Sequence, residues 1–220
     1  MPNFQGLLAT AYDELSGVLS SLTVEEGFEP SGCAGWTVVD LGFHLLSDAR
    51  RALVALHTPA DAPADTTAVD YWSAWRPPEP GDEAELWSTR IAASAHGGLV
   101  PIAARYAETT AAVLDAAAGL RPAHPVRTQG KILTTADLLS TLCVEAAVHH
   151  LDLVHRLDRP GPSAGPLAEV RRILEGLLGA PLPDRWDDAT AARRGTGRER
   201  LTAQDRLELG PAARRFPLFG

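Results

Sequence analysis

Cysteine, long apolar runs and positive charge are all scarce in this 220-residue chain. Its two cysteines, Cys33 and Cys143, are too few for a disulfide framework and form no CxxC pair, so we expect both to be small buried residues. No segment approaches the roughly 18 apolar residues of a membrane span, and the N-terminal stretch lacks a basic leader. These absences predict a cytoplasmic protein without a membrane partner.

The deficit of positive charge excludes a further class of partner. The chain has 20 basic and 28 acidic residues and a net charge of −8. Proteins that bind nucleic acids broadly usually carry a basic face, so we expect no nucleic-acid partner here. At 45% hydrophobic and 22% charged residues, the composition is that of an ordinary globular protein.

Helix signals are abundant in the first part of the chain. Over residues 4–22, apolar side chains recur at spacings of three and four, which predicts an amphipathic helix. A second helix should begin after Thr37, which can cap it, because Asp40 three residues later completes a capping box. This second helix should run to about His57.

Two more helical segments follow. Residues 82–119 have a helical pattern that is expected to be interrupted at Gly97, Gly98 and Pro101. The next helix begins at Thr134, where Asp137 repeats the T-x-x-D box. Since no convincing alternating strand separates these segments, the sequence predicts an all-α or mainly α fold built on a four-helix bundle.

The chain divides into two expected units. Residues 1–160 should form the bundle, and residues 161–220 a small C-terminal extension packed on it, with a helix over 167–178. The stretch RERLTAQ within the extension fits a strand or a loop equally well. In the bundle, the proline-rich residues 58–81 should form a long loop whose aromatic side chains cover a functional site.

The segment VEAAVHHLDL, residues 144–153, places charged groups inside an otherwise apolar helix. Glu145 and His149 are four residues apart and share one face, and Asp152 lies three residues further along it. His150 is turned about 100° away from His149 around the helix axis. A buried carboxylate needs a cation, so Glu145 should face either an arginine or a metal ion.

A third metal ligand is available on the second helix, where His44 lies between two apolar residues. Two histidines and one carboxylate from facing helices make a suitable ligand set for a divalent metal. Such a set suits zinc, and three protein ligands leave a fourth coordination position open. Asp40 or Asp152 would then accept a hydrogen bond from the free N–H of an imidazole.

The alternative to a metal is an ion pair across the bundle. In this interpretation Glu145 pairs with an arginine such as Arg90 or Arg105, and His149 is a core histidine with satisfied hydrogen bonds. The E-x-x-x-H spacing is too common to decide between these two interpretations.

Two motifs together resemble one protein family. W-T-x-x-D-L-x-x-H-L at residues 36–45 and E-x-x-V-H-x-x-D-L at residues 145–153 are similar to motifs of the mycothiol-dependent maleylpyruvate isomerase family, among the DinB-like metal-binding bundles. The resemblance implies that the metal ligands are His44, Glu145 and His149. The tail GTGRERLTAQDRLELG also looks like the short C-terminal part of many small relatives.

The resemblance also implies a function. It predicts a divalent metal, with zinc expected, that activates a low-molecular-weight thiol such as mycothiol for transfer to, or cis–trans isomerisation of, a small electrophilic substrate. The family isomerase uses an essential arginine that no motif places here. Arg76 and Arg90 are the candidates, and we take Arg90 as the predicted catalytic residue. The C-terminal domain of the isomerase is larger than the C-terminal part of this chain. The resemblance therefore supports the metal ligands more strongly than it supports the isomerase reaction.

Two rival functions stay open at this point. A non-catalytic module, in which a metal only staples the bundle, requires a fourth protein ligand, and His150 is poorly turned for that position. A metal hydrolase, in which zinc-bound water is the nucleophile, requires a general base such as Asp40, Asp48 or Asp152. The physiological substrate, the native metal and the oligomeric state are not specified by the sequence.

Overall fold

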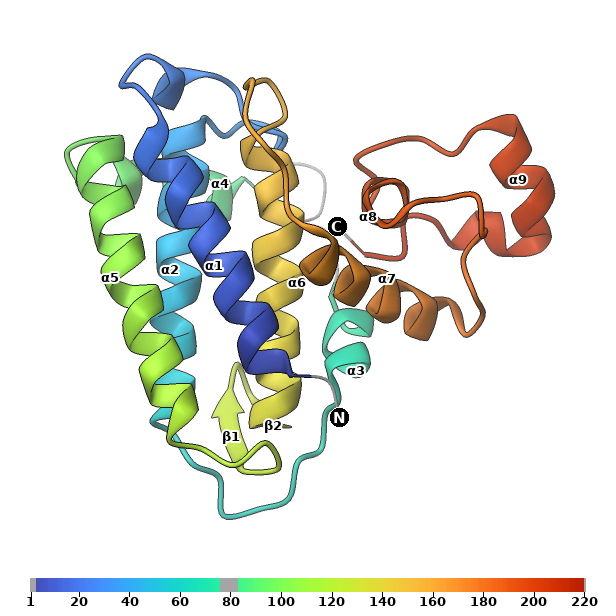
Figure 1. The fold of residues 1–220 in the computed structure, drawn as a ribbon, viewed down its shortest axis with the longest axis horizontal. Coiled ribbons are helices and arrows are strands. Elements are labelled where there is room, and N and C mark those ends of the chain that lie inside the picture. Colours follow the sequence, from blue (N-terminus) through green and yellow to red (C-terminus); the bar gives the residue numbers. More distant parts are fainter. Residues whose placement is uncertain (1–2, 76–82, 220) are drawn as a thin grey trace.

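Four long helices form the main body of the protein, for which a computed structural model describes residues 3–75 and 83–219. They are α1 (Phe4–Ser21), α2 (Val38–Leu56), α5 (Leu99–Ala118) and α6 (Thr135–Leu153), and they lie side by side in Figure 1. Contacts join α1 to α5, α5 to α2, α2 to α6 and α6 to α1. The ring of contacts makes a closed bundle, so the predicted mainly α fold with a four-helix bundle is confirmed.

Side-chain caps determine where the two helices of the later site begin. The side chain of Thr37 accepts a hydrogen bond from the Asp40 N–H, and the Asp40 carboxylate accepts one from the Thr37 N–H at 2.9 Å. Thr134 caps α6 in the same position, accepting from the Asp137 N–H at 3.0 Å. Both caps satisfy N–H groups that a helix start otherwise leaves unpaired. They confirm the predicted starts of α2 and α6.

The helical pattern over residues 82–119 corresponds to two helices. α4 (Ala84–Ser94) precedes α5, and the turn between them contains Gly97 and Gly98, whose φ angles are +78° and +99°. Glycine adopts positive φ without the steric cost that other residues incur there. The interruption expected at this glycine pair is therefore confirmed.

The prediction of a continuous loop over residues 58–81 is wrong, because this stretch of the chain contains a short helix. α3 (Ala68–Ser73) begins with a capping box in which Thr67 and Asp70 bond to each other as Thr37 and Asp40 do. It packs against α6 and against α7 (Ala164–Leu178) of the extension. Thr67 and Asp70 have the same T-x-x-D spacing that marks α2, but our prediction rested on the prolines of this stretch and did not use it. Residues 76–82 lie outside the described part of the chain.

A small hairpin was also missed by the sequence analysis. β1 (Pro125–Thr128) and β2 (Lys131–Thr134) pair antiparallel, with Val126 opposite Leu133. The connecting residues Gln129 and Gly130 both have positive φ, +48° and +76°, as a tight two-residue turn requires. Each strand has only four residues, which is too short for an alternating pattern to stand out. Val126 and Leu133 are fully buried, so the hairpin packs into the main core next to α2 and α6.

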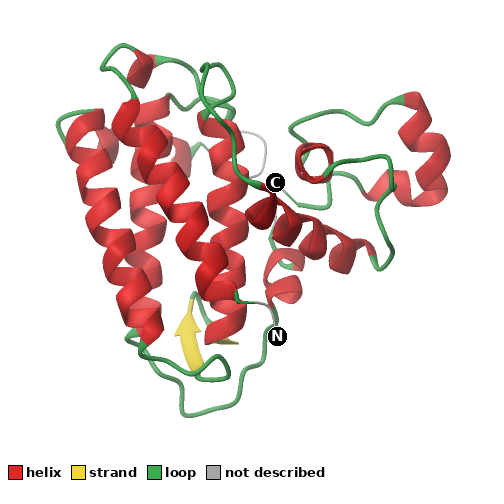
Figure 2. Ribbon diagram, in the orientation of Figure 1, coloured by secondary structure: helices red, strands yellow, loops and turns green. Residues whose placement is uncertain are grey.

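The rest of the chain forms a helical extension beside the bundle, as Figure 2 shows. It consists of α7, α8 (Asp188–Gly195), α9 (Ala203–Leu209) and the 3₁₀ helix η2 (Gly210–Arg215), while a second 3₁₀ helix, η1 (Glu26–Phe28), connects α1 to α2. The helix expected over 167–178 begins three residues earlier than predicted. Of the stretch RERLTAQ, residues 198–202 form a loop, and Ala203 and Gln204 begin α9. Among the described residues, no helix has the length and apolar character needed to cross a bilayer.

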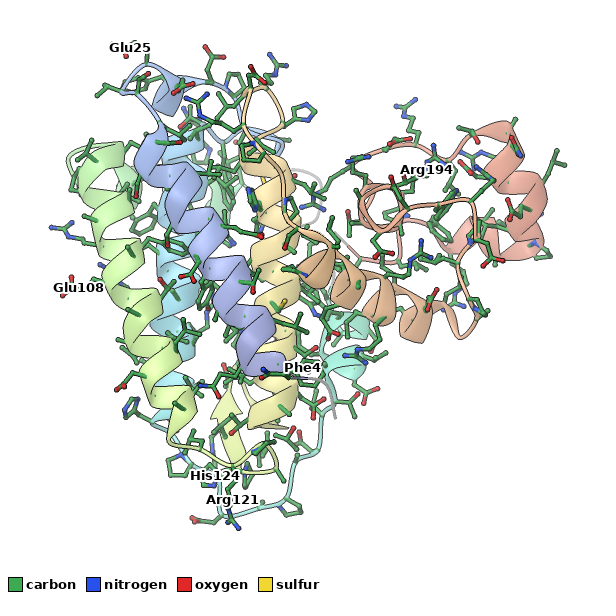
Figure 3. The ribbon with its side chains drawn as sticks, in the orientation of Figure 1. Phe4, Glu25, Glu108, Arg121, His124 and Arg194 are labelled. Atoms are coloured by element: carbon green, nitrogen blue, oxygen red, sulfur yellow. The ribbon has the colours of Figure 1, made fainter. Side chains whose placement is uncertain are left out.

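Buried charges hold the loop between α8 and α9 in place. Arg194, labelled in Figure 3, donates to Glu199 at 2.7 Å and to Asp205 at 3.0 Å. The Asp205 side chain is fully buried and also bonds to Arg185 and to the indole N–H of Trp186. Because these bonds join α8 to α9, they fix the intervening turn, which carries side chains into the candidate site.

Candidate metal centre

Three side-chain atoms of the types that bind metals meet between α2 and α6. Nε2 of His44 lies 3.2 Å from Oε1 of Glu145, and Nε2 of His149 lies 3.3 Å from the same oxygen. Glu145 and His149 are one helical turn apart on α6, so the cap at Thr134 sets their common face. All three side chains are largely buried, with 13 to 22% of their surface exposed.

The spacing of these atoms fits a divalent metal. In a tetrahedral site with ligand distances of about 2.0–2.2 Å, neighbouring donor atoms lie about 3.3–3.6 Å apart. The distances to Oε1 are 3.2 Å from His44, about 0.1 Å below that range, and 3.3 Å from His149, at its lower end. Two imidazoles and one carboxylate are also a donor set that suits zinc and other divalent first-row metals. These residues therefore can hold a metal ion without a large rearrangement.

The same atoms interact strongly as ionisable groups. Burial raises the pKa of the Glu145 carboxyl, but the neighbouring His149 and His44 outweigh burial and hold this pKa well below its usual range. Burial lowers the pKa of the His149 imidazole, whereas Glu145 and Asp152 raise it, and the result lies well above the usual range. Protons and a metal ion consequently compete for this cluster, since metal binding requires neutral imidazoles.

A second layer of charged groups orients His149. Its Nδ1 lies 3.0 Å from Oδ2 of Asp152, which is 2% exposed. Arg198, from the loop after α8, donates to both oxygens of Asp152, through Nε at 2.8 Å and Nη2 at 2.7 Å. A carboxylate held in this way accepts a hydrogen bond from Nδ1–H, so the neutral imidazole of His149 has its lone pair on Nε2, the atom that faces Glu145. Arg198 and Asp152 thus select the tautomer that a metal ligand needs.

Burial and these partners have opposite effects on Asp152. Burial raises the pKa of its carboxyl, and hydrogen bonds from His149 and Arg198 lower it. The partners dominate, so the pKa lies well below its usual range and Asp152 is ionised at neutral pH. Its negative charge is what anchors both Arg198 and the imidazole.

The loop that precedes α2 approaches α6 closely at Asp152. Sγ of Cys33 lies 3.3 Å from Oδ2 of Asp152 and 3.6 Å from Nδ1 of His149. The preceding residue, Gly32, donates its N–H to the Asp152 carbonyl at 2.8 Å. A β-carbon at Gly32 would lie only 2.6 Å from Oδ1 of Asp152, so only glycine fits this position. Cys33 therefore contacts His149 on the Nδ1 side of its ring, not on the Nε2 side.

An open cavity of about 730 Å³ leads to the metal-ligating atoms. His44, Glu145 and His149 lie in its wall, and the ring of Trp36 packs against His44 with 5.0 Å between ring centroids. The extension completes the wall with residues of two loops, namely Thr196, Gly197, Arg198, Pro217 and Phe219. A cavity of this size suits a drug-sized ligand or two smaller ones.

Comparison with known proteins places the chain in a family. A family model described as the mycothiol maleylpyruvate isomerase N-terminal domain matches residues 8–154. The chain belongs to this family. Membership indicates a mycothiol-related, metal-binding protein with a DinB-like bundle. No curated protein and no solved structure matches this chain.

In this member of the mycothiol maleylpyruvate isomerase family, the three predicted metal ligands lie together. Asp152 bonds to the free nitrogen of His149 as expected, whereas Asp40 is engaged in the cap of α2. His150 points away from the cluster, with its Nε2 at 3.0 Å from the Pro160 carbonyl. The turn of about 100° between the two adjacent histidines accounts for this difference.

The predicted arginines lie elsewhere. Arg90 is exposed on α4, with its guanidinium over the Trp87 ring at 4.8 Å, and is not part of the cavity wall. Arg105 is exposed on α5. Arg76 lies outside the described residues. Within the described chain, the ion-pair partners of Glu145 are the two histidines, so the arginine pairing considered for Glu145 is not observed with Arg90 or Arg105.

Two site residues, Cys33 and Arg198, were missed by the sequence analysis. Cys143 is buried as expected, but Cys33 is only half-buried and lines the cavity. Arg198 was not considered as a site residue, although it lies in the tail stretch GTGRERLTAQDRLELG, which resembles family relatives. Its position in that stretch was the available signal. Its pairing with Asp152, 46 residues away, needed the tertiary structure.

Proposed function

We propose that the protein is a divalent-metal-dependent enzyme, with zinc as the metal, that activates a low-molecular-weight thiol. Mycothiol is the proposed thiol, because the chain belongs to the mycothiol maleylpyruvate isomerase family. The reaction is transfer of the thiol to a small electrophile or thiol-assisted cis–trans isomerisation. One observation carries the proposal: three metal-ligating atoms with the spacing of a metal site lie in the wall of a cavity large enough for two reactants.

The residues of the chain have distinct tasks in this reaction. A divalent metal, when bound, supplies a Lewis acid that lowers the pKa of a thiol from about 8.5 and keeps it as a thiolate at neutral pH. His44, Glu145 and His149 hold the metal and leave a positive charge of about one on it, which favours an anion in the open position. Asp152 and Arg198 hold His149 in the required tautomer, and Trp36 packs over His44 and restricts its ring.

Arg198 is the arginine that our proposal uses, as a positioning residue. Its Nε and Nη2 bond to Asp152, and its Nη1 donates to the Thr196 carbonyl at 3.2 Å. It also lines the cavity, so this pairing with Asp152 lies at the edge of the substrate space. Arg90 remains a prediction, and its exposed position on α4 gives it no described contact with the cavity.

The geometry disfavours a metal that only staples the bundle. Such a site needs a fourth protein ligand, but His150 points to Pro160, and Cys33 lies on the Nδ1 side of His149. The cluster also opens onto a large cavity, which a purely structural metal does not require. A catalytic metal with an exchangeable position agrees better with both observations.

The geometry also disfavours a metal hydrolase. Asp40 is bonded to Thr37, and both oxygens of Asp152 are engaged, so neither is placed as a general base. Burial and the charge of Glu145 raise the pKa of Asp48 to about 6, which suits a base. However, Asp48 lines a small hollow of about 20 Å³ next to Glu145 and does not line the main cavity, in which a substrate would bind.

Metal analysis of purified protein, combined with a thiol assay, tests the proposal. We expect about one divalent metal per chain in the wild type and loss of metal in His44→Ala and Glu145→Ala. His57→Ala is the matched control, because His57 is exposed at the end of α2, and it should retain the metal. Wild-type protein without stoichiometric metal would overturn the proposal.

The thiol assay uses metal-loaded protein with mycothiol and either monochlorobimane or maleylpyruvate. We expect a conjugate or the trans isomer to form faster than in the metal-free variants. Full metal occupancy without conjugate or isomer would contradict thiol activation and leave a metal-binding module.

Two coarser expectations complete the proposal. We propose that residues 1–160 are the metal-binding domain and that residues 161–220 are an extension that finishes its cavity. We also propose a cytoplasmic location, which is supported by the two free cysteines.

A further inference from the structure

The segment at residues 216–219 forms one wall of the cavity. The ring of Phe219 stacks on Trp72 of α3, with 4.5 Å between centroids and 29° between ring planes. Both side chains are 5% exposed, and both line the cavity. Trp72 also lines the small hollow next to Glu145, so the stacked pair lies close to the metal-ligating cluster.

Several contacts fix this segment in place without a ligand. The Leu218 N–H donates to the Gly195 carbonyl at the end of α8, at 2.8 Å. Arg215 donates to the Leu178 carbonyl at the end of α7, at 2.7 Å. Pro217 packs so closely against Gly197 that a β-carbon there would lie 3.2 Å from its ring. A wall fixed from both sides can set the size of a ligand, because it does not yield easily.

Two chemically different sets of side chains line the cavity. The polar set includes Cys33, His155, Thr196 and Arg198. The apolar set includes Trp72, Trp75, Leu86, Val148 and Phe219. The Nε1 atom of Trp72 is buried and has no hydrogen-bond partner among the described residues, so the surface that Trp72 exposes to the cavity is ring carbon. The lining therefore offers contacts to polar and to apolar groups.

We propose that the Trp72–Phe219 wall is the subsite for an apolar, planar group of the electrophilic substrate, and that Phe219 sets how large this group can be. This inference rests on the proposed thiol-activating function and names the class of its second substrate: electrophiles that carry an aromatic or compact alkyl group. Offset stacking on the aromatic pair favours a planar group, while the polar side chains of the lining and the metal-ligating residues receive the thiol.

Binding of product analogues tests the subsite without any turnover. The ligands are S-methyl, S-butyl, S-benzyl and S-naphthylmethyl conjugates of mycothiol, and their Kd values are measured by calorimetry on metal-loaded protein. In the wild type, affinity should rise by up to about fourfold for each methylene that becomes buried. The S-benzyl conjugate should gain a further roughly two- to tenfold from stacking, and the S-naphthylmethyl conjugate should bind more weakly than S-benzyl because Phe219 limits the space.

Phe219→Ala should change this order. It should weaken S-benzyl binding by roughly two- to tenfold through the lost ring contact and strengthen S-naphthylmethyl binding, while the Kd of the S-methyl conjugate stays constant. Phe216→Ala is the matched control, because Phe216 belongs to the same segment but packs on Trp186 at 6.1 Å, outside the cavity wall. Phe216→Ala should leave unchanged the ratio of the Kd values of the S-benzyl and S-naphthylmethyl conjugates. If Phe219→Ala does not fold, Phe219→Leu retains most of the volume and should still lose the benzyl preference.

The outcomes separate the two proposals. If the S-methyl conjugate binds and neither Phe219 variant alters the ratio, the subsite is refuted and the thiol-activating function stands. If the same change appears in Phe216→Ala, the subsite is also refuted, since the effect would come from the fold of the segment. If metal-loaded wild-type protein binds none of the conjugates, the proposed function fails and the subsite with it.

Discussion

Replacing Arg198 with methionine should weaken metal binding at a site that Arg198 does not itself touch. The substitution keeps an apolar stem but removes two hydrogen bonds to Asp152, at 2.8 and 2.7 Å. Removing one partner of a buried ion pair costs about 3–5 kcal/mol. We expect the lower end, about 3 kcal/mol, because the Arg198 side chain is 19% exposed and Asp152 keeps its bond to His149.

The expected effects on stability and on metal affinity can be measured separately. A loss of about 3 kcal/mol lowers the Tm of a chain of this length by roughly 6–12 °C. With Asp152 no longer anchored, the His149 imidazole is less well oriented, and metal affinity should fall about 10- to 100-fold. Competition with a chromophoric chelator gives the affinity, and calorimetry gives the Tm.

Arg172→Met is the matched control for this prediction. Arg172 also donates two hydrogen bonds to a buried carboxylate, that of Glu169, and neither residue lines the cavity. The substitution should lower the Tm by a smaller amount, because the Arg172 side chain is 45% exposed, and it should leave metal affinity unchanged. Equal metal affinity in Arg198→Met and Arg172→Met would refute the role assigned to Arg198.

Three further predictions follow from other parts of the structure. Gly32→Ala should destabilise the protein by about 1–3 kcal/mol and weaken metal binding, because the added β-carbon would clash with Asp152. Denaturant unfolding measures the stability, and chelator competition measures the metal affinity. Wild-type stability together with wild-type affinity would contradict the close packing at Gly32. Burial raises the pKa of Asp205, but bonds from Thr202 and Arg185 outweigh it and hold this pKa well below its usual range. The stability that this ionised carboxylate contributes should be present above about pH 4 and be lost as the pH falls towards the folded pKa. In urea unfolding, the free energy of unfolding should therefore fall less below pH 4 in Asp205→Asn than in the wild type. An equal fall in the two proteins would argue against Asp205 as a source of acid sensitivity. Metal at about 1,000 times its Kd should add about 4 kcal/mol, so removing it with a chelator should lower the Tm by roughly 8–16 °C, whereas an unchanged Tm would mean that the folded state binds no metal.

Helix periodicity made the core of the candidate site predictable from sequence. The caps at Thr37 and Thr134 fix the starts of α2 and α6, and 3.6 residues per turn then places Glu145 and His149 on one face. The same geometry predicts that His150 points elsewhere, and its bond to Pro160 agrees. Local rules were sufficient for the face that Glu145 and His149 share, whereas the joining of His44 to this pair was expected from the family resemblance.

Partners that are distant in sequence could not be predicted in this way. Arg198 reaches Asp152 only because the charges around Asp205 fix the loop between α8 and α9. Cys33 reaches His149 from a loop more than a hundred residues away, through the close approach of Gly32. Phe219 likewise meets Trp72 only after the extension has packed on the bundle. Each contact depends on tertiary packing, which no local pattern reports.

The most direct test of the central claim is the visible absorption of cobalt(II)-substituted protein during titration with mycothiol. If His44, Glu145 and His149 hold a metal with an open position, cobalt(II) should bind at about one per chain, and the thiol should produce a sulfur-to-cobalt charge-transfer band. His44→Ala should show neither the cobalt spectrum nor the band. A stoichiometric cobalt spectrum that mycothiol leaves unchanged would contradict thiol activation at this site, and wild-type protein that binds no cobalt would contradict the metal site itself.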